Sequence, residues 1–372
     1  MNLELSIVMP CLNEAETIAS CIEKAKAFMQ KNNIAGEVVI GDNGSTDGSQ
    51  DIAEKLGAIV VHVDKKGYGN ASRAAIEGSR GTYIITADTD DSHDILNLYP
   101  FVEKLRAGFD LVMGNRFKGE TNKNAMPFLH RYLGNPVLTF IGNLFFKTKI
   151  GDFHCGLRGF SRAAYNDLDL STTGMEFASE IVVKASMLNL KITEVPTTVF
   201  PAGRSRKPHL RTFPDGWRHL RFLLLYSPKW LFLIPGIFFM LIGIAGTCAT
   251  VFDNDDKTLK WIPLFAGLFL ISFQFVVFYA LTKIYATNHG LIPRKKGYNN
   301  LFVYFTLERG LLVGTALTVM GFVLYYLGFK ENINLAQTLK TIVPATIIVA
   351  LGIQLVLFSF FFSILGLKDE MV

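Results

Sequence analysis

The sequence predicts an α/β domain with a mainly parallel, Rossmann-like sheet, followed by a transmembrane domain of four helices. Within residues 1–228, short apolar or β-branched runs alternate with segments whose apolar residues recur at helical spacing, as in βαβ units. Residues 229–372 contain four long apolar runs instead. The composition agrees, because 50% of the 372 residues are hydrophobic and 31 are phenylalanine, which is a heavy apolar content for a soluble protein.

The first part of the chain alternates between predicted strands and predicted helices. Strands are expected over residues 5–9, 37–41, 58–63, 82–86, 111–114 and 191–200, and helices over about 13–29, 68–79, 96–106, 126–146 and 176–190. A sheet of this type binds ligands at the carboxyl ends of its strands. We therefore expect the functional side chains to follow directly after the strands.

An acidic cluster follows the fourth predicted strand. Asp88, Asp90, Asp91 and Asp94 place four carboxylates within seven residues. Such crowding is unfavourable unless a cation neutralises it, and oxygen ligands suit Mg²⁺ or Mn²⁺. Because Mg²⁺ commonly combines one or two carboxylates with substrate phosphates, a nucleotide diphosphate is the expected partner. The alternative is a turn that leads into a helix whose first residues these acids cap.

Two other strand ends carry charged residues. Asp42 ends the second predicted strand, before a tight turn at Gly44 and Ser45, and its carboxylate is expected to accept a hydrogen bond from a base or a ribose hydroxyl. For Asp47, capping of the next helix is the favoured interpretation. Arg116 ends the fifth predicted strand and is a candidate for pairing with phosphate, the alternative being a surface arginine.

Three segments together resemble the successive signatures of the GT-A family 2 glycosyltransferases. They are Pro10-Cys11-Leu12-Asn13-Glu14, Asp42-Asn43-Gly44-Ser45-Thr46-Asp47 and Asp88-Thr89-Asp90-Asp91-Ser92-His93-Asp94. Within this family the chain is similar to the polyprenyl-phosphate glycosyltransferases, such as dolichol-phosphate mannose synthases and bactoprenol glucosyltransferases. The resemblance covers about residues 5–228 and rests on the order and spacing of the three segments.

The resemblance implies a role for most of these residues. The nucleotide-sugar donor is expected to be bound by Pro10, Asn13, Glu14, Asp42 and Asp88. Asp88 and Asp90 would hold Mg²⁺ or Mn²⁺ against the donor diphosphate, and Asp90 and Arg116 would act in catalysis. Two positions depart from the pattern, since Asn43 stands where many relatives carry a second aspartate, and Thr86 where some carry another apolar or acidic residue. Both departures leave the donor sugar undefined.

Two later segments are expected to serve the acceptor side. Residues 151–162 look like the acceptor motif of the same family, with Asp152 as the candidate for orienting the sugar or the attacking group, a further catalytic residue. Residues 204–229 hold seven Lys or Arg and one Asp, a net charge of +6. Arg204 and Lys207 are expected to clamp the donor diphosphate or attract a lipid phosphate. The compatible alternative is a polybasic segment that holds anionic lipids.

The predicted domains are a cytoplasmic catalytic domain over 1–211, an interfacial amphipathic helix over 212–229 and a transmembrane domain over 230–372. Spans at about 231–252, 261–282, 310–329 and 342–367 each reach the roughly 20 residues that cross a bilayer. Basic residues within 283–300 and acidic residues within 253–256, together with no N-terminal signal segment, place the catalytic domain and the C-terminus in the cytoplasm. Residues 126–146 are expected on the membrane surface, with a buried core helix as the alternative.

The expected function is metal-dependent, inverting transfer of one sugar from a nucleotide-sugar to a polyprenyl phosphate at the cytoplasmic membrane face. UDP-glucose is favoured by analogy alone, and no nucleic-acid partner is expected. The four helices allow homo-oligomer formation, seating of the prenyl chain or contact with a flippase, and the sequence does not choose among these. The alternatives are transfer to another lipid, a polysaccharide synthase (disfavoured because its Gln-x-x-Arg-Trp motif is absent) and a non-catalytic membrane scaffold or lipid-binding protein.

Overall fold

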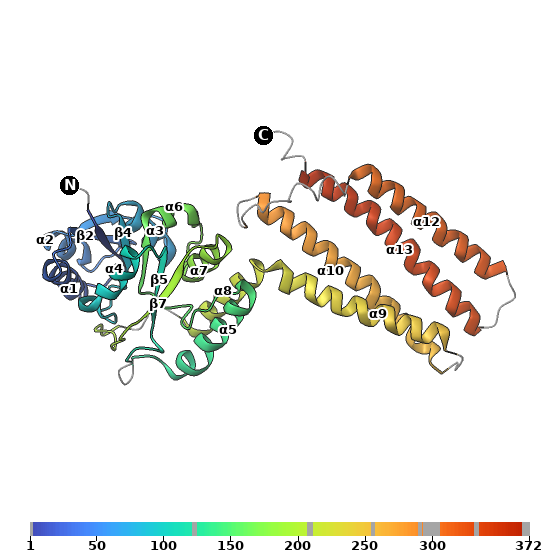
Figure 1. The fold of residues 1–372 in the computed structure, drawn as a ribbon, viewed down its shortest axis with the longest axis horizontal. Helices are drawn as coiled ribbons and strands as arrows, with labels where there is room; N and C mark the ends of the chain where they lie inside the picture. Colours follow the sequence, from blue (N-terminus) through green and yellow to red (C-terminus); the bar gives the residue numbers. More distant parts are fainter. Residues whose placement is uncertain are drawn as a thin grey trace. The chain divides into compact units, whose positions relative to one another are not determined.

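The computed structural model describes residues 3–120, 125–206, 211–253, 257–288, 292, 306–330 and 335–366. The chain divides into two compact units, Met1–Leu223 and Leu224–Val372. The first unit is an α/β domain, and the second consists of long apolar helices, as Figure 1 shows for each unit. Both parts of the predicted fold class are therefore confirmed.

A seven-stranded sheet forms the centre of the first unit. Its strands are β1 (Leu5–Cys11), β2 (Gly36–Asp42), β3 (Ile59–His62), β4 (Tyr83–Thr86), β5 (Leu111–Asn115), β6 (Arg158–Ser161) and β7 (Ile192–Pro196). They lie in the order β3-β2-β1-β4-β6-β5-β7, and only β6 runs antiparallel to its neighbours. The carboxyl ends of all the other strands therefore share one edge of the sheet.

The strand β6 is absent from the sequence prediction. Its four residues, which begin with a buried arginine and include a glycine, do not form a recognisable strand pattern. The strand forms because it fills the gap between β4 and β5, where Gly159 faces Ile85 on one side and Val112 on the other. This insertion brings the preceding loop against the end of β4, and the hydroxyl of Thr86 donates to the carbonyl oxygen of Gly156 at 3.0 Å.

Helices cover both faces of the sheet. They are α1 (Ile18–Lys31), α2 (Ser49–Lys55), α3 (Tyr68–Glu77), α4 (Tyr99–Arg106), α5 (Asn135–Phe146), α6 (Arg162–Leu168), α7 (Phe177–Met187) and α8 (Thr212–Leu225), with the short turns η1 (Ile95–Asn97) and η2 (His130–Gly134). Leu5, Ile7 and Met9 of β1 join one core with α1 and α4, because alternate strand residues face the same side. On the α3 side, a Cβ on Gly41 would lie 2.1 Å from the carbonyl oxygen of Ala71, so that position accepts only glycine.

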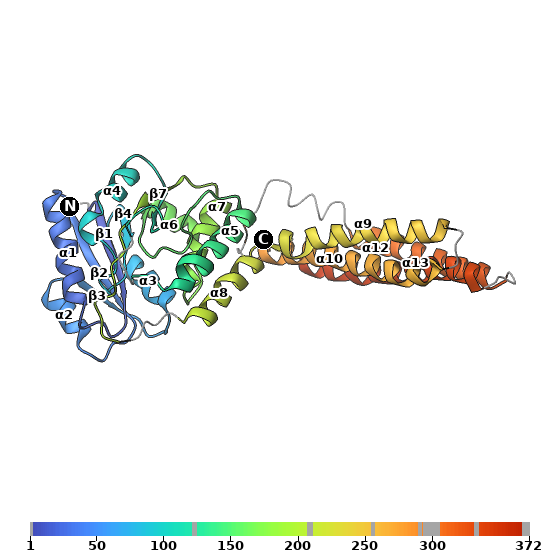
Figure 2. The ribbon, with the colours of Figure 1, turned by 90° about the horizontal axis from the view of Figure 1, so that it is seen from below.

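The second unit contains long apolar helices. They are α9 (Ile234–Phe252) with η3 (Lys229–Leu233) before it, α10 (Ile262–Asn288) with η4 (Leu259–Trp261) before it, α12 (Leu307–Lys330) and α13 (Leu335–Gly366). Among the described residues, four segments are long and apolar enough to cross a membrane: Lys229–Phe252, Leu259–Asn288, Leu307–Phe329 and Leu339–Leu365. The packing runs from α9 to α10, from α10 to α13 and from α13 to α12, and Figure 2 shows these helices as a thin layer.

Glycines set the contact between α12 and α13. The buried residues of α12, within its described part, are Gly314, Gly321 and Gly328, which stand seven residues apart. A Cβ on Gly314 would lie 2.7 Å from Cγ2 of Val356 and 2.8 Å from the carbonyl oxygen of Gly352. Small residues let membrane helices approach closely, which matters where lipid is as apolar as the side chains.

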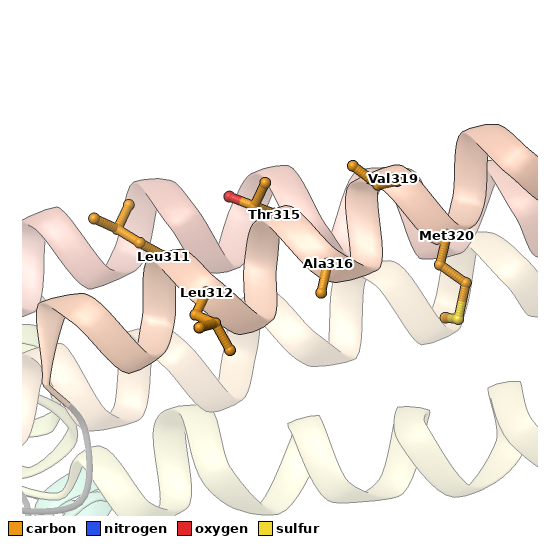
Figure 3. A pocket seen from close by; sticks show the side chains of 6 residues that line it. All are labelled: Leu311, Leu312, Thr315, Ala316, Val319 and Met320. Carbon is orange, nitrogen blue, oxygen red and sulfur yellow. The ribbon is translucent and has the colours of Figure 1, made fainter.

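Another side of α12 carries an exposed apolar groove. It is lined by Leu311, Leu312, Thr315, Ala316, Val319 and Met320, whose side chains project from this one helix in Figure 3. The groove contains no charged side chain, and its single hydroxyl belongs to a threonine. These properties suit contact with lipid acyl chains rather than with a polar ligand.

We predict that Gly314→Ala destabilises the second unit while Gly267→Ala does not. The added methyl at Gly314 meets backbone and side-chain atoms of α13, which costs about 1–3 kcal/mol as overpacking. Gly267 of α10 has no neighbour within 4 Å of the same position, so its alanine variant gains helix propensity alone. Thermal unfolding of the full-length protein in detergent checks this, and equal melting temperatures for the two variants would contradict it.

A buried carboxylate organises the start of α7. Glu180 accepts hydrogen bonds from the backbone N–H and hydroxyl groups of Ser171 and Thr172 and pairs with Lys184 at 3.0 Å. Burial raises the pKa of Glu180, but the hydrogen bonds from Thr172 and the charge of Lys184 outweigh it and hold the pKa below its ordinary value. The group therefore stabilises the fold in its charged form.

We predict that Glu180→Gln costs about 3 kcal/mol near neutral pH, because it leaves Lys184 buried without its partner. Since the folded pKa of Glu180 is depressed, its contribution is complete above the ordinary glutamate pKa and disappears as the pH falls through the folded value. The stability difference between wild type and variant should shrink in acid. Urea unfolding followed at several pH values measures it, and a pH-independent difference would be inconsistent with this assignment.

Candidate active site

The carboxyl ends of β1, β2, β4 and β5 meet at one edge of the sheet. The register pairs Cys11 of β1 with Asp42 of β2, and Val8 of β1 with Thr86 of β4. The ends of these strands and the loops that follow them contain most of the predicted site residues. Strand direction alone therefore gathers them, as expected for ligand sites of open α/β sheets.

Asp88 follows β4 and is held from two sides. The hydroxyl of Tyr68, at the start of α3, donates to its Oδ1 at 3.0 Å, and its backbone N–H donates to Nδ1 of His93 at 3.1 Å. Its Oδ2 is adjacent to Gly156, where a Cβ would stand 2.8 Å away. Nε2 of the buried His93 lies 3.8 Å from the same oxygen, and the side chain of Asp88 is 33% exposed.

Asp90 is more tightly engaged than Asp88. Its Oδ1 accepts from the backbone N–H of Ser92 at 3.1 Å and from the hydroxyl of the same residue at 2.5 Å. Its Oδ2 pairs with Nη2 of Arg204 at 3.0 Å. Both oxygens of Asp90 therefore have protein partners in this structure.

The four acids of the cluster separate in space. Asp91, in the left-handed conformation with φ 60°, turns toward α1 and pairs with Lys24 at 2.6 Å. Asp94 accepts from the amide of Asn97 at 2.8 Å. Within the described ranges, no group of three or more His, Cys, Asp and Glu side chains is arranged to hold a metal. Asp88 and Asp90, in contrast, have Tyr68 and Arg204 as partners in the loop that follows β4.

Arg116 and Asp152 form a buried pair beside this edge. Nε and Nη2 of Arg116 lie 2.6 and 2.8 Å from the two oxygens of Asp152, and the backbone N–H of Arg116 adds a third bond at 3.2 Å. Burial lowers the pKa of Arg116, but the hydrogen bonds and charge of Asp152, with a smaller contribution from Asp88, raise it above its ordinary value. Arg116 is therefore a permanent, oriented cation.

Asp42 and Asn13 tie the loops after β2 and β1 together. Oδ2 of Asp42 accepts from two backbone N–H groups of the following turn, at 2.9 and 3.0 Å, and from the amide of Gln50 at 2.5 Å. Asn13, with φ 56°, accepts from the backbone N–H of Thr46 at 2.8 Å. These two residues, which were predicted to bind the nucleotide-sugar, therefore join the two loops through hydrogen bonds within the protein.

Pro10 and Asp47 also act through intramolecular bonds. The carbonyl oxygen of Pro10 accepts from the hydroxyl of Thr89 at 2.9 Å, which fixes the residue between Asp88 and Asp90. Asp47 accepts from the backbone N–H of Ser49 at 3.0 Å, at the start of α2. The N-cap position of α2 is Gly48, so Asp47 bonds the first N–H of the helix from one residue before that position.

Residues 199–206, which we call the strap, cross the loops after β1 and β4. The backbone N–H groups of Phe200 and Gly203 donate to the carbonyl oxygens of Ser92 and Asp90, each at 2.9 Å. On the other side, the backbone N–H and hydroxyl of Ser205 donate to Glu16, each at 2.6 Å. The strap is therefore fixed by its backbone to both loops.

Two arginines of the strap converge on Glu14. Nη1 of Arg204 lies 2.6 Å from Oε1 of Glu14, and Arg206 contacts the same oxygen. Glu14 is 5% exposed, so these ion pairs are shielded from water and stronger than surface pairs. Arg204 also reaches Asp90, which joins three predicted site residues in one network. Lys207 lies outside the described residues.

Three side chains connect the 151–162 segment with α8. The hydroxyl oxygen of Ser179 lies 3.2 Å from Nε2 of His154 and 2.8 Å from Nδ1 of His219. Burial, with repulsion from other positive groups including Arg158, lowers the pKa of His154 well below its ordinary value and that of His219 to about 4. Both imidazoles are therefore neutral near neutral pH and serve as hydrogen-bonding links rather than as phosphate-binding cations.

Tyr68, His93 and Arg158 support the site without having been identified from sequence. Arg158 of β6 is 1% exposed and directs Nε to the carbonyl oxygen of Cys155 at 2.7 Å. Tyr68 lies in no local pattern that marks it, and Arg158 lies within the 151–162 segment but was not singled out there. The position of His93 next to the acids in the sequence could have marked it as a site residue. Its ring accepts a hydrogen bond from the backbone N–H of Asp88, and this contact depends on the turn between the two residues.

Comparison with known proteins gives matches over both units. A family model described as Glycosyl transferase family 2 matches residues 6–169, and one described as Glycosyltransferase family 2 C-terminal transmembrane region matches residues 280–366. The low-salt glycan biosynthesis hexosyltransferase Agl6 of Haloferax volcanii is 36% identical over 97% of this chain and 89% of its own length. A dolichyl-phosphate hexose transferase of the same organism is 30% identical over 52% of this chain and 81% of its own length.

Among solved structures, glucosyl-3-phosphoglycerate synthase from Mycobacterium tuberculosis has a TM-score of 0.47 and 20% sequence identity, covering 60% of this chain and 78% of its own. The similarity to Agl6, in contrast, extends through nearly the whole chain. The chain therefore belongs to glycosyl transferase family 2 and is a membrane glycosyltransferase with a GT-A catalytic unit.

Proposed function

We propose that the protein transfers a single hexose, with inversion, from a nucleotide-sugar to a polyprenyl phosphate, with UDP-glucose as the first donor to test. The observation that carries this proposal is the placement of two carboxylates, Asp88 and Asp90, and two guanidinium groups, Arg116 and Arg204, at one edge of the sheet. Arg204 pairs with Asp90, and the charge of Asp88 contributes to the raised pKa of Arg116. A metal-bound diphosphate requires both, because carboxylates bind the cation and guanidinium groups bind the phosphate oxygens.

A divalent metal fits the acidic pair. Hard oxygen ligands suit Mg²⁺ and Mn²⁺, and a site with two protein carboxylates leaves the remaining positions to phosphate oxygens and water. Tyr68 and His93 hold Asp88, and Gly156 leaves open the space beside its Oδ2. When bound by Asp88 and Asp90, the metal supplies positive charge to the departing diphosphate.

In this mechanism the residues of the chain align the donor and the acceptor and stabilise the departing diphosphate. No residue has to abstract a proton. An acceptor phosphate is already anionic, so its oxygen attacks the anomeric carbon while the bond from that carbon to the diphosphate breaks, and the nucleoside diphosphate leaves with the bonding electrons. Arg116 presents its charge to phosphate oxygens at this edge. Asp152 has both oxygens bonded to Arg116, which makes it a positioning residue for that arginine.

The first unit also exposes an apolar surface suited to a membrane interface. Its large exposed side chains on η2, α5, α8 and the preceding residues are Phe128, Leu129, Tyr132, Leu133, Val137, Phe140, Leu144, Phe213 and Trp217. His130 and Thr212 link η2 with α8 through a 3.0 Å hydrogen bond. Such an apolar helical face supports the interfacial placement and a lipid acceptor. The name of the dolichyl-phosphate hexose transferase relative points to the same acceptor class.

We extend the proposal to topology. The catalytic unit and the C-terminus would lie in the cytoplasm, because acidic residues follow the first span and basic residues follow the second. Part of each of these two charged segments lies outside the described residues. The catalytic domain would end near residue 211 and the interfacial helix near residue 229.

We predict that the full-length protein in detergent makes a chloroform-soluble sugar product from one nucleotide-sugar, a polyprenyl phosphate and Mg²⁺ or Mn²⁺. UDP-glucose, UDP-GlcNAc, UDP-galactose and GDP-mannose would each be tested with dolichyl and undecaprenyl phosphate. Asp90→Ala should remove the product, since it removes a proposed metal ligand. A donor that binds without yielding lipid product would refute the polyprenyl acceptor, and an Asp90→Ala variant with full activity would refute the catalytic site.

We predict that Asp152→Asn lowers kcat/KM at least roughly tenfold while nucleotide binding is retained. The asparagine keeps the shape of the side chain but loses the charge and one acceptor that orient Arg116. Asp167→Asn, which changes an exposed aspartate of α6, serves as the control. Steady-state kinetics with the identified donor measure the effect. Unchanged kinetics in Asp152→Asn would mean that orientation of Arg116 is not required.

A further inference from the structure

The guanidinium group of Arg204 lies between a carboxylate of the loop after β1 and a carboxylate of the loop after β4. Its Nη1 lies 2.6 Å from Glu14 and its Nη2 lies 3.0 Å from Asp90. The three side chains are 12%, 5% and 13% exposed. One oxygen of the proposed metal ligand Asp90 is thus already neutralised by a charge that belongs to the protein itself.

The fit of Arg204 to this position is incomplete. Each carboxylate receives one nitrogen of the guanidinium group, rather than the paired contact that makes arginine–carboxylate interactions strongest. The Nε of Arg204 is buried without a hydrogen-bond partner in the part of the chain that the structure describes. A buried donor left unsatisfied favours exchange of this partner for a better one, and a diphosphate offers several oxygens.

Glu14 and Asp90 differ in whether they keep a positively charged partner when the side chain of Arg204 moves away. Glu14 keeps the guanidinium group of Arg206, which contacts the same carboxylate oxygen. For Oδ2 of Asp90, Arg204 is the cation paired with it among the described residues. The strap itself stays attached, because the backbone N–H of Gly203 bonds to the carbonyl oxygen of Asp90. Movement of one side chain therefore frees Asp90 without undoing the loop.

We propose that Arg204 couples donor binding to metal binding. Without donor, Arg204 competes with the divalent cation for Asp90, so that the metal alone binds weakly. When the donor arrives, its diphosphate takes Arg204 as a partner, and the released carboxylate oxygen of Asp90 becomes available to the metal. The inference rests on the proposed function in one respect, namely that Asp88 and Asp90 hold the metal.

Coupling of this kind is reciprocal. If the nucleoside diphosphate raises the affinity for the metal, the metal raises the affinity for the nucleotide by the same factor. The enzyme would then assemble its metal–diphosphate complex as one cooperative step. The same exchange keeps the buried acids neutralised between turnovers, since either Arg204 or the metal is always next to Asp90.

The test measures Mn²⁺ binding by electron paramagnetic resonance on the full-length protein in detergent, alone and with saturating UDP or GDP. For wild type we expect a nucleotide to tighten Mn²⁺ binding on the order of tenfold or more. In Arg204→Gln, Mn²⁺ alone should bind more tightly than to wild type. The enhancement by nucleotide should be smaller than in wild type, because only the direct ligation by phosphate oxygens remains. Arg204→Lys should fall between the two, because an ammonium group keeps the charge but not the fork that spans both acids.

Arg106→Gln is the matched control. It removes the same charge from the first unit, but Arg106 pairs with Glu4 before β1, away from the carboxyl edge of the sheet. It should bind Mn²⁺ as wild type does. If Arg204→Gln and Arg204→Lys both match wild type in affinity for Mn²⁺ alone and in nucleotide enhancement, the coupling role is overturned while metal-dependent transfer stands. If no protein binds Mn²⁺ even with UDP or GDP, the metal proposal and this inference fall together.

Discussion

The balance of charge at the end of β4 is the constraint on which the catalytic unit depends. A buried strand brings Asp88 and Asp90 to the edge of the sheet, where burial makes uncompensated carboxylates costly. In the folded domain each acid has a different partner: the hydroxyl of Tyr68 bonds to Asp88, and Arg204 pairs with Asp90. The neighbouring acid Asp91 is drawn to Lys24 on α1. Each acid of the cluster thus has its own partner at this end of the strand.

The same arrangement explains why supporting residues come from distant parts of the chain. The strap joins the loops after β1 and β4. The 151–162 segment is held against β4 by its own strand, β6. Asp152 holds Arg116 in a fixed orientation from this segment. Ser179, between two neutral histidines, then connects the segment to α8. A series of buried contacts therefore links α8 to the segment that holds Arg116.

The membrane unit follows a different physical rule. Lipid removes the hydrophobic driving force between helices, so close packing takes its place. α12 and α13 meet through glycines at seven-residue intervals, and the remaining surface of α12 is largely apolar and exposed. Its groove, lined by aliphatic side chains, has the character of a lipid-facing surface. The first unit is thus the glycosyltransferase unit, and the second unit anchors the protein in the membrane.

The sequence by itself determined the α/β fold, the four apolar spans and the positions of Asp42, Asp88, Asp90 and Arg116 at strand ends, because periodicity and strand direction are local properties that the chain displays directly. The tertiary structure decided which of those side chains are available. Asp42 is used within its own turn, Asp152 is bonded to Arg116, and Glu14 is paired with arginines nearly two hundred residues later. It also decided the place of β6, whose sequence carries no strand signal of its own. Contacts of this kind depend on the meeting of distant segments, and no local pattern records them.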